Sequence, residues 1–392
     1  MTSFTAFFSP ALLSHRFMDR LVALSLGLVS ALPVWSQAPT MPSERPRNVV
    51  LLIGDGMGLT QVSASYLTLT EGGLRPGSHM GRFPVTGLMV TTSTDDLITD
   101  SGAGATALST GRKTYNGAVG VGPDSLPLTT VLEKAARLGR RTGMLVTCEV
   151  THATPASFAA HRVDRDLYED IAVDLSKAPL NWLVGGGRNH FSARSDQRDL
   201  LTEMKRSRGM TLMNRAEEVL QDQPGVDRQA LTALLWDGPA PSILQGRDSS
   251  LMARLAERAC RDLDRPGVLS RDSGFFLMIE GSQIDWGGHA NDGAYVLTET
   301  MDLDRVVGAV LDFAQRDGQT LVLMTADHET GGMAINSGQR NGQDLKWGFT
   351  TKKHTGALVP VMAYGPGAYS FTGIMDNTEL YRRLCGIWGL KP

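Results

Sequence analysis

Ser101 stands between Asp100 and a run of small residues, an arrangement that could bind and attack a phosphate-sized anion. The pattern predicts a loop that turns into a short helix at Ser101 and stops at Gly111. Unpaired N–H groups and the positive end of the helix dipole meet at such a helix start. The alternative is that Asp100 or Ser101 only caps the helix. The choice depends on whether other segments supply groups that make the serine a nucleophile.

Glu280, Asp285 and His289 are three potential metal ligands within ten residues, and they directly follow an apolar run at 275–279. Asp285 and His289 are four residues apart, so they share a face if this segment is helical. Charged side chains are rarely buried without partners, and packing alone therefore explains these residues poorly. We interpret them as ligands of a metal ion.

Asp327 and His328 repeat this arrangement after another apolar run, and a mixed set of nitrogen and oxygen donors suits Zn²⁺. Asp55 follows the apolar run 48–53 in the sequence Asp-Gly-Met-Gly, where the alternative is a plain turn aspartate. His354 precedes a further apolar run and by itself would be structural or exposed.

His152 and Thr154 follow the apolar run 144–146, and Arg165 lies thirteen residues beyond His152. The guanidinium group of an arginine forms a planar fork that matches phosphate oxygens. Arg162 is also close in sequence, so the residues alone leave the choice between these two arginines open.

Short apolar runs rich in branched residues recur along the chain and predict buried strands. They cover residues 48–53, 85–92, 142–147, 275–279, 320–324 and 358–363. Helical patterns such as 129–138 and 294–313 lie between them. This alternation predicts an α/β fold, a three-layer αβα sandwich around a predominantly parallel sheet. The ionisable residues described above follow such runs, and open α/β sheets bind their ligands at the carboxyl ends of the strands.

Two regions break the alternation of apolar runs and helical patterns. Residues 181–271 contain three successive glycines, many charges and an amphipathic stretch at 251–263, and we expect a surface excursion with its own helices. Residues 337–353 are polar and predict a surface loop.

The composition is that of a globular enzyme. Of the 392 residues, 42% are hydrophobic and 20% are charged, and the formal net charge is -3. The chain has no basic block, which disfavours a nucleic-acid or an anionic-membrane partner. Cys148, Cys260 and Cys385 are scattered, and we expect buried thiols rather than a disulfide framework.

The N-terminal segment resembles an export signal. Arg16 and Arg20 precede an apolar stretch, and small residues around Ala38 suit cleavage. We expect residues 1–38 to be removed, with translation starting at Met1 or at Met18, and residues 39–392 to form a single catalytic domain that is periplasmic or secreted. The alternative is an uncleaved anchor, but the apolar stretch is short for a stable membrane span.

Six segments of the chain, in this order, resemble the motifs of the alkaline phosphatase family. They are Asp-Gly-Met-Gly at 55–58, Asp-Ser-Gly-Ala-Gly-Ala-Thr at 100–106, Thr-His-Ala-Thr-Pro-Ala at 151–156, Glu280 to His289, Thr-Ala-Asp-His-Glu at 325–329 and His-Thr-Gly at 354–356. Only 25 residues lie between His328 and His354, where larger relatives insert a crown-like interface domain. The resemblance therefore implies a compact version of the fold, in which the family's usual homodimer is an open expectation.

The resemblance implies three metal ions. Two are zinc ions, one held by Asp285, His289 and His354 and the other by Asp55, Asp327 and His328 beside Ser101. The third is a harder cation, usually Mg²⁺, held by Thr154 and Glu280 with Asp55 as a bridge. The phosphate-binding arginine of the family matches Arg165.

Two positions depart from the best-known bacterial pattern of the family. His152 replaces an aspartate near the magnesium, and Trp286 replaces a lysine. A neutral imidazole is a poorer partner for hydrated Mg²⁺ than a carboxylate, and an indole cannot form a charge-assisted bond to phosphate. The departures therefore put the occupant and the affinity of the third site in question.

The resemblance implies hydrolysis of phosphate monoesters through a phosphoserine on Ser101, with a broad substrate range and with Asp100 orienting Arg165 or the loop. A phosphodiesterase is the main alternative, but Arg165 would recognise oxygens that a diester has substituted. A sulfatase is disfavoured because no Cys-x-Pro-x-Arg motif adjoins Ser101. A non-catalytic phosphate-binding protein would need a lost ligand or nucleophile, and we find none.

Overall fold

The computed structural model describes residues 45–68, 77–221, 230–265, 274–339 and 342–390. These residues all belong to one compact unit, residues 42–392. The expected export signal, with its alternative start at Met18, lies outside the described residues. Among the helices of the described ranges, none combines the length and the apolar character that crossing a membrane requires.

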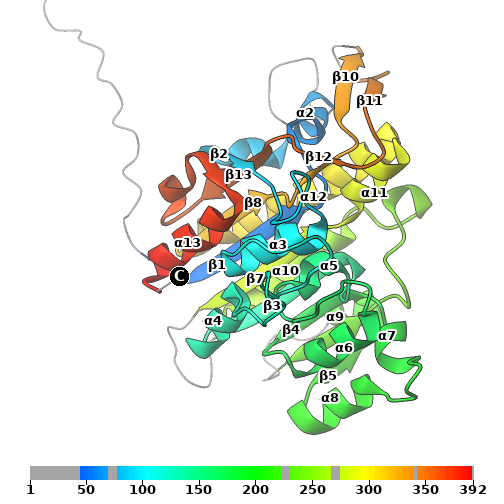
Figure 1. The fold of residues 1–392 in the computed structure, drawn as a ribbon, viewed down its shortest axis with the longest axis vertical. Helices are drawn as coiled ribbons and strands as arrows, with labels where there is room; N and C mark the ends of the chain where they lie inside the picture. Colours follow the sequence, from blue (N-terminus) through cyan, green and yellow to red (C-terminus); the bar gives the residue numbers. More distant parts are fainter. Residues whose placement is uncertain (1–44, 69–76, 222–229, 266–273, 340–341, 391–392) are drawn as a thin grey trace, which may run out of the picture. The chain divides into compact units, whose positions relative to one another are not determined.

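A ten-stranded sheet forms the centre of the unit (Figure 1). Its strands, in spatial order, are β14 (Gly373–Asp376), β2 (Val85–Val90), β13 (Val359–Tyr364), β8 (Thr320–Thr325), β1 (Asn48–Gly54), β7 (Phe275–Gly281), β3 (Arg141–Glu149), β4 (Trp182–Gly186), β6 (Leu231–Leu234) and β5 (Thr211–Met213). Neighbouring strands are parallel except at β13, which runs antiparallel to both β2 and β8. The prediction of a predominantly parallel sheet is therefore confirmed.

The strands at the centre of the sheet are buried on both faces. Every residue of β1 and of β8 is buried, as expected for continuous apolar runs covered by helices on either side. β2 instead alternates between buried and more exposed residues, because it lies near one edge of the sheet.

Helices cover both faces of this sheet and complete the predicted αβα sandwich (Figure 1). On one face, α12 (Gly293–Asp317) packs against α10 (Leu251–Leu263), α2 (Leu59–Thr68) and α11 (Gln283–Ala290). The helices that pack together on the other face are α3 (Ser101–Thr110), α4 (Val131–Arg137), α5 (Ala153–Ala156) and α13 (Asn377–Trp388). The remaining helices are α6 (Tyr168–Lys177), α7 (Asn189–Ser192), α8 (Leu200–Arg208), α9 (Ala216–Gln221) and the short 3-10 helices η1 (His79–Arg82), η2 (Ile243–Gln245) and η3 (Ala368–Phe371).

Residues 181–271 carry their own helices, α7 to α10, as expected, but the segment is not a surface excursion. This segment contributes β4, β5 and β6, which extend the central sheet at the edge beyond β3. The strands are short, and the glycines that end β4 resemble a loop in sequence. Position 186 requires a glycine for packing, because a Cβ atom there would lie 2.1 Å from the carbonyl oxygen of Gly238.

The expectation of a surface loop at residues 337–353 is also corrected. β10 (Met333–Ser337) pairs with β11 (Lys346–Phe349) as a two-stranded antiparallel sheet. A second small sheet joins β9 (Glu329–Thr330) to β12 (His354–Thr355). This pairing brings His354 back beside the segment that follows β8.

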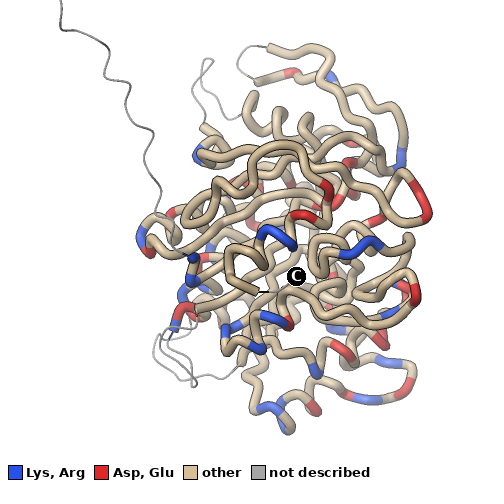
Figure 2. The backbone as a smooth tube through the Cα atoms, turned by 60° about the vertical axis from the view of Figure 1, so that its left-hand side comes forward, with Lys and Arg blue, Asp and Glu red and all other residues tan. Residues whose placement is uncertain are grey.

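Charged residues are spread along the described chain. Figure 2 shows lysine and arginine positions interspersed with aspartate and glutamate positions over the backbone. The three cysteines are buried free thiols, as the sequence predicted.

Candidate active site

Three adjacent parallel strands bring the acidic residues of separate motifs together. β1 lies between β7 and β8, and Ile53 is in register with Glu280 on one side and with Thr325 on the other. Asp55 directly follows β1, and Asp327 lies two residues beyond the end of β8. The carboxyl ends of β1, β7 and β8 therefore deliver three carboxylates to one place at the edge of the sheet.

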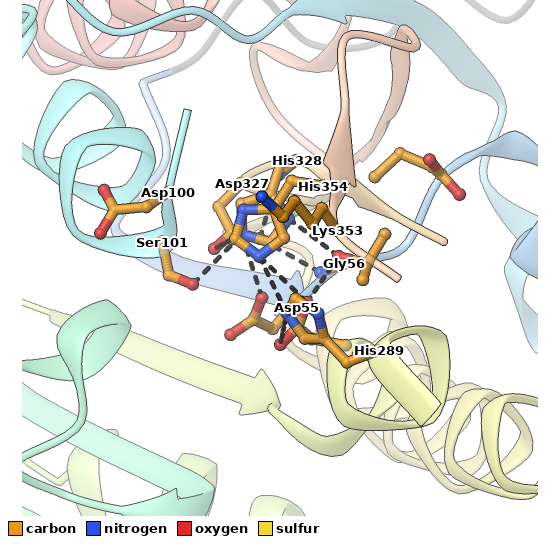
Figure 3. Close-up of polar contacts among 12 residues, drawn as sticks. Asp55, Gly56, Asp100, Ser101, His289, Asp327, His328, Lys353 and His354 are labelled. Carbon is orange, nitrogen blue, oxygen red and sulfur yellow. Dashed lines mark hydrogen bonds and ion pairs between the residues drawn. The ribbon is translucent and has the colours of Figure 1, made fainter. Parts of the chain in front are cut away.

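Ser101 is the first residue of α3, as the sequence predicted. Asp100 caps this helix by accepting a hydrogen bond from the backbone N–H of Ala103, and Gly111 ends it in the left-handed conformation. The small residues of the motif allow α3 to pack closely against the segment that follows β8, because a Cβ atom on Gly104 would lie 3.0 Å from the carbonyl oxygen of Asp327. The hydroxyl of Ser101 is buried and lies 3.1 Å from His328 Nε2 (Figure 3).

Asp55, Asp327 and His328 form the first cluster of metal-ligand type, and all three are fully buried. His328 Nε2 lies 3.5 Å from Asp55 Oδ1 and 3.4 Å from Asp327 Oδ2. Asp55 Oδ1 and Asp327 Oδ2 have no hydrogen-bond partner. Buried carboxylate oxygens without a donor are costly, so this cluster is suited to a cation.

Asp285, His289 and His354 form the second cluster. His289 Nε2 lies 3.1 Å from His354 Nε2 and 3.3 Å from Asp285 Oδ2. The other ring nitrogens are held by backbone carbonyls, His289 Nδ1 by Lys352 and His354 Nδ1 by Thr99. A carbonyl at Nδ1 leaves the lone pair on Nε2 for a metal ion.

The two clusters adjoin each other. The rings of His328 and His354 stack with their centroids 3.6 Å apart. Figure 3 shows Asp55, Asp327, His328, His354 and His289 grouped beside Ser101.

Burial and mutual repulsion disfavour the ionised forms of Asp55, Glu280 and Asp327 when no cation is bound. Burial, and then the charge of Asp327, raise the pKa of Glu280 to about 8. Burial and the charge of Asp285 raise the pKa of Asp327 to about 6. Burial and the same neighbours raise the pKa of Asp55 well above its usual value. A group of buried carboxyl side chains with raised pKa values is characteristic of a functional site.

Cys148, His152 and Glu280 form a third cluster of metal-ligand type. Cys148 Sγ lies 3.4 Å from Glu280 Oε2, while Glu280 Oε1 and His152 Nδ1 are buried without a hydrogen-bond partner. Thr154 Oγ1 lies 3.5 Å from Asp55 Oδ2, between this cluster and the first. Cys148 was not among the predicted site residues, although its place directly after the predicted strand at 142–147 was a usable signal.

Arg165 lies at the same site, and Arg162 does not. Arg165 Nη1 donates to Asp100 Oδ2 at 2.8 Å, and Arg165 Nη2 lies 3.4 Å from His152 Nε2. Arg162 pairs instead with Asp174 at 2.6 Å. The geometry therefore separates two arginines that residue types alone left equivalent.

His152 and Trp286, the two departures from the family pattern, contact each other. Their ring centroids are 6.2 Å apart in an edge arrangement. Burial, and then the nearby Arg165, lower the pKa of His152 to about 4, so its imidazole is neutral at pH 7.

Comparisons with known proteins agree with these motifs. A family model described as alkaline phosphatase matches residues 46–346. Alkaline phosphatase 4 of Bacillus subtilis is 32% identical over 85% of this chain and 87% of that protein. The alkaline phosphatase of Escherichia coli is 31% identical over 89% of this chain and 88% of that protein.

Solved structures agree as well. The alkaline phosphatase from the Antarctic bacterium TAB5 matches with a TM-score of 0.79 and 37% identity, over 89% of this chain and 99% of that chain. A mutant of that enzyme, in which a histidine is replaced by glutamate, has Mg bound in its M3 site. By sequence, fold and the arrangement of its motifs, the chain belongs to the alkaline phosphatase family.

Proposed function

We propose that this protein hydrolyses phosphate monoesters to an alcohol and inorganic phosphate, with Ser101 as the nucleophile. The observation that carries the proposal is the position of the Ser101 hydroxyl. It lies at the start of α3 and 3.1 Å from His328 Nε2, beside two clusters of metal-ligand type. A helix start supplies free N–H groups for an anion, and the clusters supply what a serine needs to become reactive.

The donor atoms fit the cations that the family resemblance implies. We infer one Zn²⁺ at Asp285, His289 and His354 and a second at Asp55, Asp327 and His328, because mixed nitrogen and oxygen donors suit zinc. We infer a third, Mg²⁺-type cation at Thr154 and Glu280 with Asp55 as a bridge. The unpartnered, buried Glu280 Oε1 supports this third site.

The reaction that we propose has two steps, formation of a phosphoserine on Ser101 and its hydrolysis. Bound divalent cations would lower the pKa of the serine hydroxyl and offset the negative charge of the phosphate. Ser101 Oγ attacks phosphorus, the ester P–O bond breaks, and the alcohol leaves with a proton. Water then attacks the phosphoserine, which releases inorganic phosphate and restores the hydroxyl.

Arg165 would bind the phosphate oxygens that the reaction leaves unchanged. Its guanidinium is oriented by Asp100, which also accepts hydrogen bonds from the backbone N–H groups of Ala103 and Gly117. A planar fork held in this way matches two oxygens of the phosphoryl group. Because this contact is made to the phosphoryl group and not to the alcohol, we propose a broad range of monoesters as substrates.

A chromogenic phosphate monoester and its diester analogue would test this function. We expect turnover of the monoester, loss after chelation, and recovery with Zn²⁺ and Mg²⁺ together. Ser101→Ala should lower kcat by at least about a thousandfold. Ser109→Ala is the matched control, because Ser109 is a buried serine of the same helix that donates to the Ser157 carbonyl. Preference for the diester, or full activity of Ser101→Ala, would refute the proposal.

We further propose that residues 1–38 direct export and that residues 39–392 act as one catalytic domain, as a monomer or as the homodimer usual in the family. The basic and apolar pattern of the N-terminal segment supports export. Mass determination of the protein from the periplasm or the medium should give a chain that begins near residue 39. A full-length chain retained in the membrane would contradict this proposal.

A further inference from the structure

Thr330 lies between the first two clusters, and its side chain contacts one residue of each. Thr330 Oγ1 lies 2.5 Å from Asp285 Oδ1 and 3.2 Å from His328 Nδ1. Thr330 is fully buried, so water does not compete for these contacts. Asp285 belongs to one proposed zinc site and His328 to the other, and the hydroxyl is therefore shared between the two sites.

The chemistry of the three groups fixes the direction of the hydrogen bonds. An ionised carboxylate can only accept, so the hydroxyl proton of Thr330 points to Asp285 Oδ1. The same hydroxyl oxygen can then only accept from His328, which places the imidazole proton on Nδ1. His328 Nε2 consequently keeps its lone pair, and this is the nitrogen that faces Ser101, Asp55 and Asp327.

Two glycines of the other motifs make room for Thr330. A Cβ atom on Gly56 would lie 2.8 Å from Thr330 Oγ1, and one on Gly288 would lie 2.9 Å from Thr330 Cγ2. The backbone N–H of Thr330 donates to the Gly56 carbonyl at 3.1 Å, and Gln61 Nε2 donates to the Thr330 carbonyl at 3.1 Å. Backbone bonds and close packing thus hold the side chain in place.

We propose that Thr330 is a positioning residue that couples the two cation sites through the directed chain His328 Nδ1–H to Thr330 Oγ1–H to Asp285 Oδ1. The inference rests on the proposed function only in taking these clusters as cation sites. A cation bound at either cluster fixes the orientation of its own ligand. The hydrogen bonds of Thr330 then restrict the orientation of the ligand at the other cluster as well. Zinc binding at the first site should therefore strengthen zinc binding at the second.

Stepwise zinc affinities of the metal-free, full-length protein would test the coupling, by competition with a chromogenic chelator and without any substrate. Thr330→Val keeps the shape of the side chain and removes the hydroxyl. We expect this variant to lose about tenfold in affinity for the second zinc ion, while Thr330→Ser stays close to the native value. Thr232→Val controls for the loss of a buried threonine hydroxyl elsewhere, since Thr232 lies in β6 and donates to Met210 Sδ.

Nitrogen NMR of the imidazole groups gives a second readout that needs no variant to fold. It should show the proton of His328 on Nδ1 in the metal-free native protein, where no zinc ion on Nε2 dictates the position of the proton. Unchanged zinc affinities in Thr330→Val, an equal loss in Thr330→Ser, or a proton on Nε2 in the native protein would each overturn the inference. A protein that shows the coupling and the Nδ1 proton but hydrolyses no monoester would instead refute the proposed function alone.

Discussion

His152 contributes a ring nitrogen to the cluster that it forms with Cys148 and Glu280. An imidazole and a thiol are softer donors than the oxygens that Mg²⁺ prefers. His152 is buried, its pKa is lowered to about 4 by that burial and by Arg165, and its Nδ1 has no partner. Beside the third site that we propose at Thr154, Glu280 and Asp55, His152 therefore supplies a neutral ring where a further carboxylate would hold the hydrated ion more firmly.

Replacing His152 by aspartate should strengthen Mg²⁺ binding. We expect His152→Asp to retain Mg²⁺ about tenfold more tightly, because a carboxylate accepts hydrogen bonds from the waters of the ion. Magnesium content after gel filtration in magnesium-free buffer measures this retention. His152→Asn is the matched control, since it has a similar shape without the charge. Equal retention in the native protein and in His152→Asp would show that His152 does not limit the site.

At the scale of single residues, sequence patterns and family resemblance predict most of the site, and contacts between distant segments supply the rest. Motifs that follow apolar runs indicate Asp55, Asp285 and His328 as site residues, because ionisable side chains next to a buried strand are rarely left without partners. Thr330 carries no such signal, and Cys148 carries only its place after the predicted strand at 142–147. Their contacts depend on how β3 lies beside β7 and how β9 lies beside α11, and local sequence does not encode these neighbours.

The contact between α4 and the segment after α5 depends on the charge of His161. His161 Nε2 lies 3.0 Å from Glu133 Oε1, and His161 Nδ1 lies 2.7 Å from the Gly120 carbonyl. Both ring nitrogens thus face acceptors, and only the protonated ring donates to both. Burial opposes this charge, but the bonds to Glu133 and Gly120 outweigh it and raise the pKa of His161 above 6.5.

Because the folded-state pKa of His161 is raised, the stability from its charge is fully present below about pH 6.5 and is lost as the pH rises through the raised value. Burial opposes ionisation of Glu133, but the hydrogen bonds from His161 and Thr130 outweigh it and lower the pKa of Glu133. The stability that this carboxylate contributes is therefore lost only in acid, below about pH 4.5. We expect His161→Ala to destabilise the protein by about 1 kcal/mol more at pH 5.5 than at pH 9. Urea unfolding at the two pH values measures this, and Glu133→Gln should remove most of the difference. Equal destabilisation at both pH values would contradict the assignment.

At the scale of helices and strands, the sequence predicts best where patterns are long and regular. The amphipathic stretch 251–263 is α10 with the same bounds, and the helical pattern 294–313 lies within α12. The strands of residues 181–271 were missed because β5 and β6 have only three and four residues. Runs this short acquire their strand conformation from pairing at the edge of the sheet, which periodicity does not reveal.

For the molecule as a whole, the buried carboxylates make stability depend on cations and on pH in opposite ways. Asp327 and Glu280 have pKa values raised to about 6 and about 8, chiefly by burial, against about 4 in an unfolded chain. A raised carboxyl pKa favours the folded state at low pH, and this stability is lost as the pH rises from about 4 to about 8. Bound cations would reverse the effect, because they require the ionised carboxylates.

Melting temperatures with and without cations should therefore diverge as the pH rises. We expect the chelated protein to melt at a lower temperature at pH 8 than at pH 5.5, and the stabilisation by Zn²⁺ and Mg²⁺ to grow over this range. It should reach about 4 kcal/mol when free zinc exceeds its Kd by a thousandfold. Glu280→Gln should flatten the pH dependence of the chelated protein. Parallel curves for the two forms would contradict this electrostatic account.

The central claim, that Ser101 is the nucleophile of a metal-dependent phosphomonoesterase, is tested most directly by trapping the covalent intermediate. The loaded protein would be mixed with a phosphate monoester, quenched in acid within milliseconds, digested and analysed by mass spectrometry. We predict one added phosphoryl group on the peptide that contains Ser101, absent from the chelated protein and from Ser101→Ala, and present in Ser109→Ala. Turnover of the monoester with no phosphoryl group on Ser101, or with the group on another residue, would contradict the claim.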